Sequence, residues 1–459
     1  MDTPKVTVYI PSHNYGAFLQ EAIESVLRQT YSSWELLIIN DSSTDNTPEV
    51  MEYYKGDERI RLFHTSYGSL PKVCNLAIRE ARGEYIIRLD GDDVFGSNIL
   101  LVLATHLDQN PDCALVFPDY YLVDEAGGIV AHEWREKFFQ SNHVFDNPPN
   151  GACCLIRRSV LEEVHCYRED LGAQDGYDLW NKLRKSHRVS NVNLPLFFYR
   201  RHDSSLTTDS RRILAARRHI KLDAVAETLN AYRPLVLCIP CRQNYDFVPD
   251  LWDRPLCGKT LLEREIEKAL RSKLFDTIAV CCDNPRAREV MERYADPRLF
   301  FHARRREDTI RSASLALTLD SLFSRIDPDR RGTTVISYPQ APFVSLESLE
   351  EALTTLVIND ADAALGMIEV DEPLFKRGAH GLVRINPFRG VRSDFDAIYQ
   401  QVNTARALKN RNVDKGALDG PLVVHFPMQK DEFFFINSAQ NLRVAEALLR
   451  DSPPEGARS

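Results

Sequence analysis

The most concentrated chemical signal in the sequence is the run RLDGDDVF, which places Asp90, Asp92 and Asp93 within four residues. Three carboxylates this close repel one another, and the pKa of each rises unless something offsets the charge. A divalent cation offsets it, because Mg²⁺ binds one or two carboxylates together with phosphate oxygens. The alternative is an acidic turn whose aspartates cap backbone amides. The run therefore predicts either a metal–diphosphate site or a capped turn.

Polar residues also follow two other predicted strands. Ser12 and Asn14 come directly after KVTVYI, and Asp41 comes directly after WELLIIN. In open α/β sheets, ligands bind in the crevice at the carboxyl ends of the parallel strands. We therefore expect these residues and the acidic run to line one nucleotide pocket.

The elements that must position these residues alternate between strands and helices. The segments KVTVYI, WELLIIN, IRLFH and YIIRL have the character of strands, while AFLQEAIESVLRQ and LPKVCNLAIREARG have apolar residues at helical spacing. This alternation indicates a parallel, doubly wound α/β sheet. A helix over DLWNKLRKSH, a strand over NLPLFFYRRH and a helix rich in Arg, Lys and Ala complete this part.

The second half of the chain repeats the opening pattern. LVLCIPCRQNY, which begins at Leu235, resembles VTVYIPSHNYG, which begins at Val6: both are apolar runs that end in Ile-Pro before a polar stretch. Strand segments then alternate with helical ones again, which predicts a second α/β domain. The predicted domains are residues 1–230 and 231–450, and the tail 451–459 is expected to be disordered.

Composition excludes several classes of function. The chain has 459 residues and a formal net charge of -9, so nucleic acid is not the expected partner. Its amino terminus lacks a signal-peptide pattern, and no apolar run approaches the ~18 residues of a membrane span. The ten cysteines include two adjacent pairs, Cys153-Cys154 and Cys281-Cys282, and we expect them to be reduced, mostly buried thiols. These features predict a cytoplasmic protein.

Four segments of the first half appear in a recognisable order. They are VYIPSHNYGAFLQEAIESVLRQTYSSWELLIINDSSTDNT, AIREARGEYIIRLDGDDVF, AQDGYDLWNKLRK and YRRHDSSLT. Together they resemble the family-two glycosyltransferases of GT-A fold, over about the first 205 residues. The resemblance implies an inverting, metal-dependent transferase that moves a sugar from a nucleotide diphosphate donor, most often a UDP-sugar, to a hydroxyl. The acceptor class would be a glycan, a glycolipid or a glycoprotein.

The resemblance also assigns roles to single positions. Asp41 would accept a hydrogen bond from the nucleotide base, Arg82 would lie near the ribose and the phosphates, and Asp90 would hold the ribose. The positions that would contact the nucleotide are Pro11, Ser12, Asn14, Asp41, Arg82 and Asp90.

A second group of positions would carry the metal and the chemistry. Asp92 would ligate Mn²⁺ or Mg²⁺, with Asp93 as a supporting carboxylate and His202 close to the metal or the pyrophosphate. Asp175 falls where the family keeps its general base, which accepts the proton of the attacking hydroxyl. A single displacement with one base gives inversion at the anomeric carbon.

The base position departs from the family pattern. The family has an acidic pair there, whereas this sequence reads Gln174-Asp175-Gly176. Asp178, one helical turn further on, competes for the role of base. Asp175 could instead cap the helix that follows it, and His202 could be an ordinary loop histidine.

The second half resembles the cytidylyltransferases that make CMP-activated acidic sugars, over about residues 233 to 450. The resemblance implies a glycine-rich loop with a lysine after the Ile-Pro, to bind the triphosphate. In this sequence Arg242 is present there, but no glycine or lysine follows until Gly258-Lys259. Without glycine, the backbone cannot approach a triphosphate closely. Near the end of the domain, Asn437 and Asn441 stand where the resemblance leads one to expect metal-binding carboxylates, and neutral amides bind Mg²⁺ poorly.

Three readings follow for the whole chain. The first is a transferase with a non-catalytic accessory domain, which could also form a homodimer. The second is a bifunctional enzyme that makes a CMP-sugar as well as transferring a sugar. The third is a scaffold that only binds nucleotide sugars. A lipid-linked acceptor would bring the first domain to the inner face of a membrane.

Overall fold

The structure is a computed structural model that describes residues 3–135, 151–171, 174–202, 210–310, 313–370, 372–378, 381–385, 398–415 and 417–451. Contacts group residues 1–217, with the described part of 373–396, into an amino-terminal unit. The described parts of 218–372 and 397–459 form a carboxy-terminal unit. The division falls within helix α7 (Ser210–Val225), ahead of the boundary predicted after residue 230. Most of the predicted tail lies outside the described residues.

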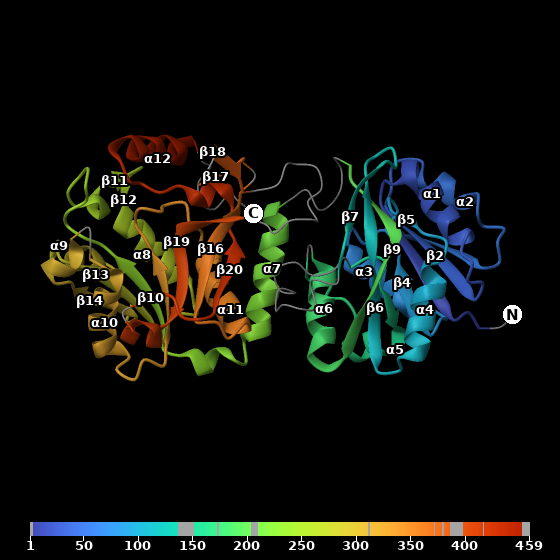
Figure 1. Ribbon diagram of the computed structural model, residues 1–459, viewed down its shortest axis with the longest axis horizontal. Helices are drawn as coiled ribbons and strands as arrows, with labels where there is room; N and C mark the ends of the chain where they lie inside the picture. Colours follow the sequence, from blue (N-terminus) through green and yellow to red (C-terminus); the bar gives the residue numbers. More distant parts are fainter. Residues whose placement is uncertain are drawn as a thin grey trace. The chain divides into compact units, whose positions relative to one another are not determined.

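The amino-terminal unit is built on a nine-stranded sheet with the order β3-β2-β1-β4-β8-β6-β9-β5, and β7 pairs with β6 (Figure 1). Strands β1 to β4 run parallel, and β8 joins β4 antiparallel. The strands are β1 (Val6–Ser12), β2 (Trp34–Asp41), β3 (Ile60–Thr65), β4 (Tyr85–Arg88), β5 (Val94–Phe95), β6 (Cys113–Val123), β7 (Ile129–Glu133), β8 (Leu155–Arg157) and β9 (Arg188–Arg200).

Helices cover both faces of this sheet because its strands are apolar on both sides. Ile38 of β2 packs in one core with α1 and α4, whereas its neighbour Ile39 packs in another core with α3 and α6. Such strands are typical of a sheet buried on both faces. The helices are α1 (Gly16–Leu27), α2 (Thr47–Glu52), α3 (Leu70–Glu80), α4 (Ile99–Gln109), α5 (Arg158–Glu163) and α6 (Asp175–Ser186).

The carboxy-terminal unit has a seven-stranded sheet with the order β14-β13-β10-β15-β19-β16-β20. Its strands are β10 (Leu235–Pro240), β13 (Thr277–Cys282), β14 (Leu299–Ala303), β15 (Thr333–Ser337), β16 (Ala363–Glu369), β19 (Tyr399–Lys409) and β20 (Val423–Pro427). Its helices are α8 (Leu261–Arg271), α9 (Arg286–Glu292), α10 (Leu315–Ile326), α11 (Leu346–Ile358) and α12 (Ala439–Asp451). A small ribbon of this unit pairs β11 (Pro255–Leu256) with β12 (Lys259–Thr260). A second ribbon, β17 (Phe375–Gly378) with β18 (Gly381–Arg384), groups with the amino-terminal unit.

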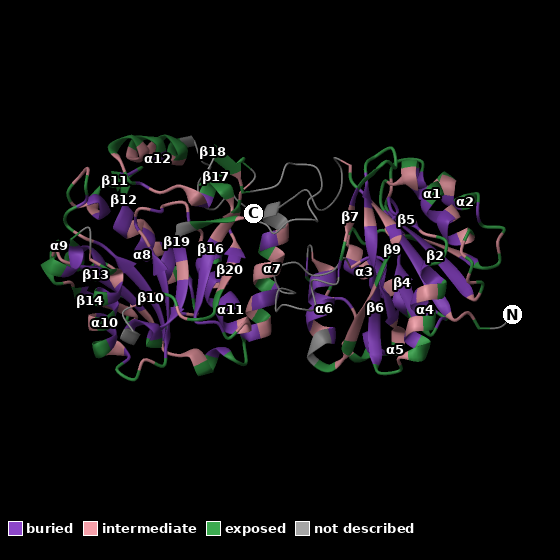
Figure 2. Cartoon of the chain, in the orientation of Figure 1, coloured by how far each residue is buried: buried purple, intermediate pink, exposed green. Residues whose placement is uncertain are grey.

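The two Ile-Pro segments occupy the same place in the two sheets. β1 lies between β2 and β4, with both neighbours parallel to it, and β10 lies between β13 and β15 in the same way. The next strand in each sheet, β8 or β19, is antiparallel. Figure 2 shows the central strands of each sheet, β1, β2 and β4 in one and β10, β13 and β15 in the other, as buried. The predicted α/β class is confirmed for both halves.

Helix α7 is fixed to the carboxy-terminal unit by buried charges. Lys221 donates to Oε1 of Glu351 at 3.0 Å, and Arg218 donates to Oε2 of the same residue at 2.7 Å. Glu351 is 1% exposed and Lys221 is 2% exposed. Burial raises the pKa of Glu351, but the two cations outweigh burial and hold that pKa below its ordinary value. These ion pairs therefore stabilise the packing of the second half of α7 against α11.

No helix in the part of the chain that the structure describes combines the length and apolarity needed to cross a bilayer. Contact with a membrane face and dimerisation stay predictions.

Candidate active site

The acidic run forms the turn that follows β4, at the carboxyl edge of the parallel strands. Oδ2 of Asp92 lies 2.9 Å from Nε2 of His202. Oδ1 of Asp93 accepts a hydrogen bond from the backbone amide of Arg200 at 2.9 Å. The end of β9 is thus packed against the turn, which brings Asp92, Asp93 and His202 together as predicted.

Arg200 holds the turn in place through its side chain as well. The guanidinium is 4% exposed, and its Nε donates to the carbonyl of Asp92 at 3.0 Å. Its other nitrogens donate to Glu21 at 2.6 Å and to the carbonyl of Glu125 at 2.8 Å. Because the guanidinium bonds to the backbone carbonyl of Asp92, Arg200 fixes the position of the turn.

The turn carries more negative charge than its surroundings offset. Burial raises the pKa of Asp90 to about 6, against the opposing effect of Arg88 and with smaller contributions from Asp92 and Asp175. Burial also raises the pKa of Asp93 well above its usual range, and the Asp92 and Asp90 carboxylates add to this. Oδ2 of Asp93 is buried without a hydrogen-bond partner. A bound cation would favour the ionised carboxylates and would give the Oδ2 atom of Asp93 a partner.

Asp92 and His202 fit such a cation. Two ligands placed at about 2.1 Å from one octahedral ion lie about 3 Å apart, and the two side chains are separated by 2.9 Å. The described residues contain no group of three or more His, Cys, Asp or Glu side chains arranged to hold a metal. The remaining ligands would therefore be phosphate oxygens and water, as is usual for Mg²⁺.

The loop after β1 supplies the next wall of the site. Ser12, the last residue of β1, is 2% exposed, and its Oγ is buried without a hydrogen-bond partner. Pro11 pairs in register with Ile39 of β2. Asn14 has a φ of 61°, and its Oδ1 accepts from the amide of Thr44 at 2.7 Å. Asn14 thus joins the loops after β1 and β2, and Ser12 keeps an unused hydroxyl at the edge.

Asp41 ends β2 and is 6% exposed. Its Oδ1 accepts from the amide of Tyr67 at 2.6 Å and from Oγ1 of Thr65 at 2.9 Å, and its Oδ2 accepts from the amide of Ser69 at 3.2 Å. The carboxylate therefore orders the loop after β3. A nucleotide base would have to share this carboxylate with the loop.

Asp175 reaches the same edge from helix α6. It is the first residue of that helix, and the residue at the cap position is Gln174, with a φ of 61°. Oδ2 of Asp175 lies 2.6 Å from Nη1 of Arg88, whose Nε lies 3.0 Å from Oδ1 of Asp90. The competing Asp178 instead pairs with Lys182 at 2.9 Å. The structure thus brings Asp175, and not Asp178, to the acidic turn.

Arg82 is not brought to this site. It precedes β4, its side chain is exposed, and its amide donates to Oε1 of Glu35 at 2.7 Å. Glu35 is the second residue of β2, at the opposite end of that strand from Asp41. A residue ahead of a parallel strand lies at the amino edge of the sheet, so Arg82 is too far along the sheet to reach a nucleotide at the carboxyl edge.

The cations that do reach the site are Arg88 and Arg200, which the sequence interpretation did not select. Both end a strand and are buried, with 6% and 4% exposure. A charged side chain inside a strand that is otherwise apolar is itself a signal, because arginine is almost never fully buried unless it is paired. The aspartates that follow YIIRL were the sequence signal for the partners of Arg88. The RRH at the end of β9 was the corresponding signal for Arg200.

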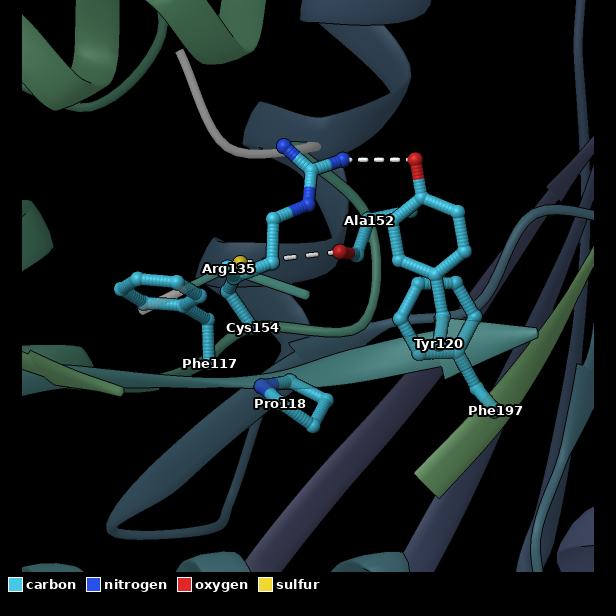
Figure 3. Close-up of a pocket in the computed structure, with 7 residues that line it drawn as sticks. All are labelled: Phe117, Pro118, Tyr120, Arg135, Ala152, Cys154 and Phe197. Atoms are coloured by element: carbon cyan, nitrogen blue, oxygen red, sulfur yellow. Dashed lines mark hydrogen bonds between the residues drawn. The ribbon is translucent and has the colours of Figure 1, made fainter. Parts of the chain in front are cut away.

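A small pocket in the same unit was not predicted. Figure 3 shows the Arg135 guanidinium directed at the Tyr120 hydroxyl, which it reaches at 2.6 Å, with Phe197 beside the tyrosine ring. Cys153, which lies between two lining residues, donates its amide to the carbonyl of Arg88 at 2.7 Å. The pocket wall is therefore continuous with the strand of the site. The lining residues are Phe117, Pro118, Tyr120, Arg135, Ala152, Cys154 and Phe197.

The carboxyl edge of the second sheet is occupied by its own side chains. Asp283, which follows β13, accepts from the amide of Gln243 at 2.7 Å and from Oγ1 of Thr309 at 2.9 Å. Arg304 donates to the carbonyl of Cys241 at 2.8 Å and to that of Asp308 at 2.7 Å. The polar groups at this edge therefore bind one another.

The loop after β10 is closed in the same way. Asp250 has a φ of 47°, and its Oδ1 accepts from Nε1 of Trp252 at 3.1 Å and from Asn284 at 3.0 Å. Its amide donates to the carbonyl of Gln243 at 2.6 Å. Near the end of the unit, Asn441 donates to the carbonyl of Phe435 at 3.1 Å.

Comparison with known proteins gives two family matches. The family model described as "Glycosyl transferase family 2" matches residues 7–165, and the one described as "Cytidylyltransferase" matches residues 254–421. The "Glycosyltransferase GlyG" of Streptococcus pneumoniae serotype 4 is 34% identical over 219 residues, which cover 44% of this chain and 72% of GlyG.

Two further similarities have defined ligands in their names. The "UDP-Glc:alpha-D-GlcNAc-diphosphoundecaprenol beta-1,3-glucosyltransferase WfgD" of Escherichia coli is 27% identical over 213 residues, which cover 46% of this chain and 82% of WfgD. The crystal structure of S. aureus TarS 1-349 in complex with UDP shares 18% identity at a TM-score of 0.40, over 48% of this chain and 65% of TarS. The chain spans less than two thirds of several other relatives, 63% and 32% of two of them.

Proposed function

The chain belongs to glycosyl transferase family 2, and from that membership we propose that its amino-terminal unit is an inverting, metal-dependent transferase. Its donor would be a nucleotide diphosphate sugar, and UDP is the nucleotide that we favour because the name of WfgD states a UDP donor. The acceptor would be a hydroxyl of a glycan, glycolipid or glycoprotein. The name of WfgD also states a lipid-linked acceptor, which supports the glycolipid class.

The observation that carries this proposal is the pairing of Asp92 with His202 beside carboxylates whose charge is not offset. The distance of 2.9 Å suits two ligands of one cation, and burial together with the neighbouring carboxylates raises the pKa of Asp90 and of Asp93. Mn²⁺ or Mg²⁺ held by these side chains would neutralise charge on a leaving diphosphate.

The residues of the chain would then divide the work. Asp41 would receive the nucleotide base, with Pro11, Ser12 and Asn14 around it, and Asp90 would receive the ribose. Asp175 would take the proton of the acceptor hydroxyl as the acceptor oxygen bonds to the anomeric carbon. The bond from that carbon to the diphosphate oxygen breaks, and its electron pair leaves with the nucleotide.

For the carboxy-terminal unit we propose an accessory role without nucleotidyl transfer. A loop that cradles a triphosphate needs free backbone amides. In the loop after β10, the amide of Gln243 already donates to Asp283, and the amide of Asp250 donates to the carbonyl of Gln243. The match to the cytidylyltransferase family favours a second candidate, which is a bifunctional enzyme. A binding scaffold is the third.

The test is calorimetric titration of the full chain with UDP, GDP, dTDP, CMP and CTP, each with and without Mn²⁺. We expect one nucleoside diphosphate, UDP, to bind only with Mn²⁺, and Asp92→Ala to abolish that binding. Failure of every diphosphate to bind would overturn the transferase proposal. Metal-dependent binding of CTP that survives Asp92→Ala would instead favour the bifunctional enzyme.

A further inference from the structure

Arg88 places one buried guanidinium between two carboxylates that come from different elements. Its side chain is 7% exposed. Nη1 donates to Oδ2 of Asp175, at the start of α6, at 2.6 Å, and Nη2 donates to Oδ2 of Asp90, in the turn after β4, at 3.5 Å. Nε lies 3.0 Å from Oδ1 of Asp90, an ion-pair contact without hydrogen-bond alignment. In the proposed reaction Asp90 belongs to the donor side and Asp175 to the acceptor side. The guanidinium is therefore the direct link between the two halves of the site.

The surroundings leave this guanidinium little freedom. Nη1 also lies 3.9 Å from Sγ of the buried Cys74 on α3. The carbonyl of Arg88 accepts from the amide of Cys153 at 2.7 Å, which ties the loop before β8 to the same strand. Because Arg88 is enclosed on several sides, it can hold both carboxylates in fixed positions.

Two glycines bring α6 close enough for the contact. A Cβ on Gly176 would lie 2.7 Å from Cα of Gly151, and a Cβ on Gly151 would lie 3.4 Å from Nη2 of Arg88. The loop and the first turn of α6 therefore touch backbone to backbone, directly beside Asp175. Larger residues at either position would push Asp175 away from Arg88.

We propose that Arg88 is a positioning residue that orients the Asp175 carboxylate for proton transfer and ties it to the donor site through Asp90. This inference rests on the proposed function. The geometry also explains why a second carboxylate is present. When Asp175 accepts the acceptor proton it loses its charge, and Arg88 would be a buried, unpaired cation if Asp90 did not remain beside it.

The two-carboxylate arrangement therefore keeps the buried charge paired before and after the step. One proton moves from the acceptor oxygen to Asp175, and the side chain of Asp90 still lies beside Arg88 after that transfer. An arginine with a structural role alone would lower the stability of the fold without a selective loss of kcat.

The test uses Arg88→Gln, Arg88→Lys, Asp175→Asn and the double variant Arg88→Gln/Asp175→Asn in the full chain. The first readout is release of UDP from a panel of UDP-sugars with Mn²⁺, with water or an added glycan as acceptor. The second is the affinity for UDP with Mn²⁺ by calorimetry. Thermal unfolding shows that each variant is folded. Arg61→Gln is the matched control, because Arg61 pairs with Glu80 and Glu35 at the amino edge of the sheet.

We expect Arg88→Gln to lower kcat about 100-fold, as for loss of an oriented base, and to lower UDP affinity by no more than about tenfold, through the loss of the contact with Asp90. Arg88→Lys, which keeps the charge but lacks the planar fork that places separate nitrogens on the two carboxylates, should lose about tenfold. In the Asp175→Asn background, Arg88→Gln should cost no more than about twofold, because neither residue then has a base to orient.

Two results would overturn the inference. In one, the losses from Arg88→Gln and Asp175→Asn multiply. In the other, UDP affinity falls as far as kcat. If Arg88→Gln does not fold, Arg88→Lys and its combination with Asp175→Asn decide the question in the same way. Absence of UDP binding and UDP release in the unmodified chain would defeat the proposed function itself, which is a different outcome.

Discussion

The two units share a strand arrangement and differ at its carboxyl edge. Where β4 ends, the amino-terminal unit continues with an acidic turn, Asp90 to Asp93, in which one buried carboxylate oxygen has no hydrogen-bond partner. Where β15 ends, the carboxy-terminal unit continues with Tyr338-Pro339-Gln340, and the carbonyl of Gln340 accepts from the amide of Ile436 at 2.8 Å. The edge of the amino-terminal sheet keeps a polar atom without a hydrogen-bond partner, whereas at the edge of the carboxy-terminal sheet the chain bonds to itself.

The aspartates that follow the second strand of each sheet make the same point. Asp41 ends β2 and Asp283 directly follows β13. Asp41 accepts from two backbone amides and a threonine hydroxyl, and Asp283 accepts from one backbone amide and a threonine hydroxyl. A carboxylate at a strand end is therefore not enough to define a ligand site. What distinguishes the amino-terminal unit is the group of carboxylates beyond those that the fold itself uses.

The largest effect should come from the candidate base. Asp175→Asn keeps the size of the side chain but removes its ability to accept a proton, so we expect UDP release from a UDP-sugar to slow about 10²- to 10⁴-fold. UDP affinity should stay nearly unchanged. The matched control is Asp283→Asn in the other unit, which should not alter the rate. Equal losses in both variants would erase the functional difference between the two edges.

The next largest effect should be on stability. Lys221→Met leaves Glu351 buried with Arg218 as its remaining cationic partner, and loss of one partner from a buried ion pair costs about 3–5 kcal/mol. Denaturant unfolding of the full chain measures it. Arg28→Met is the control, because Arg28 pairs with Glu24 on an exposed helix face and such pairs contribute about 0.3–0.5 kcal/mol.

The same cluster predicts a pH dependence. The pKa of Glu351 is lower in the folded chain than its ordinary value of 4.5. Its contribution is therefore fully present above pH 4.5 and is lost as the pH falls through the folded pKa. Unfolding of the carboxy-terminal unit should accordingly become easier below pH 4.5. A stability that stays flat in this range would show that Glu351 is not held ionised by Lys221 and Arg218.

A smaller effect is expected from the glycine contact that seats α6. Gly176→Ala would place a Cβ 2.7 Å from Cα of Gly151, and such overpacking costs about 1–3 kcal/mol. Because Asp175 is the neighbouring residue, the rate of UDP release should fall by up to about 100-fold, as for a displacement of about 1 Å. Gly56→Ala, where nothing lies within 4 Å, is the control.

The smallest effect is expected in the loop after β10. Asp250→Gly relieves a left-handed backbone but removes the bonds to Trp252 and Asn284. Each contribution is about 1 kcal/mol, so two lost bonds against one relieved strain should lower the free energy of unfolding by about 1 kcal/mol. CTP should still not bind, because the amide of Gln243 remains bonded to Asp283. CTP binding by this variant would show that one residue alone closes the site.

Local patterns in the sequence were sufficient for the scaffold and for most of the candidate site. Apolar strands alternating with helices specify a doubly wound sheet, because this arrangement buries both faces. The acidic run, Ser12 and Asp41 follow strands directly, so the rule that ligands bind at carboxyl ends predicted that they would meet. The repeated Ile-Pro pattern likewise predicted the second domain, whose α/β fold the structure confirms.

Only the tertiary structure decided which charges meet. Arg88 and Asp175 are far apart in the sequence, and their contact depends on the path of α6 and on two glycines that let it approach. Arg82 is close to β4 in sequence but precedes it, so the length of a strand separates it from the site. Asp250 and Asp283 of the second unit resemble ligand-binding residues by sequence position, but their carboxylates accept hydrogen bonds from the unit itself. Sequence pattern fixes where a residue enters a strand or helix, whereas the packing of distant elements decides which polar atoms remain free to bind.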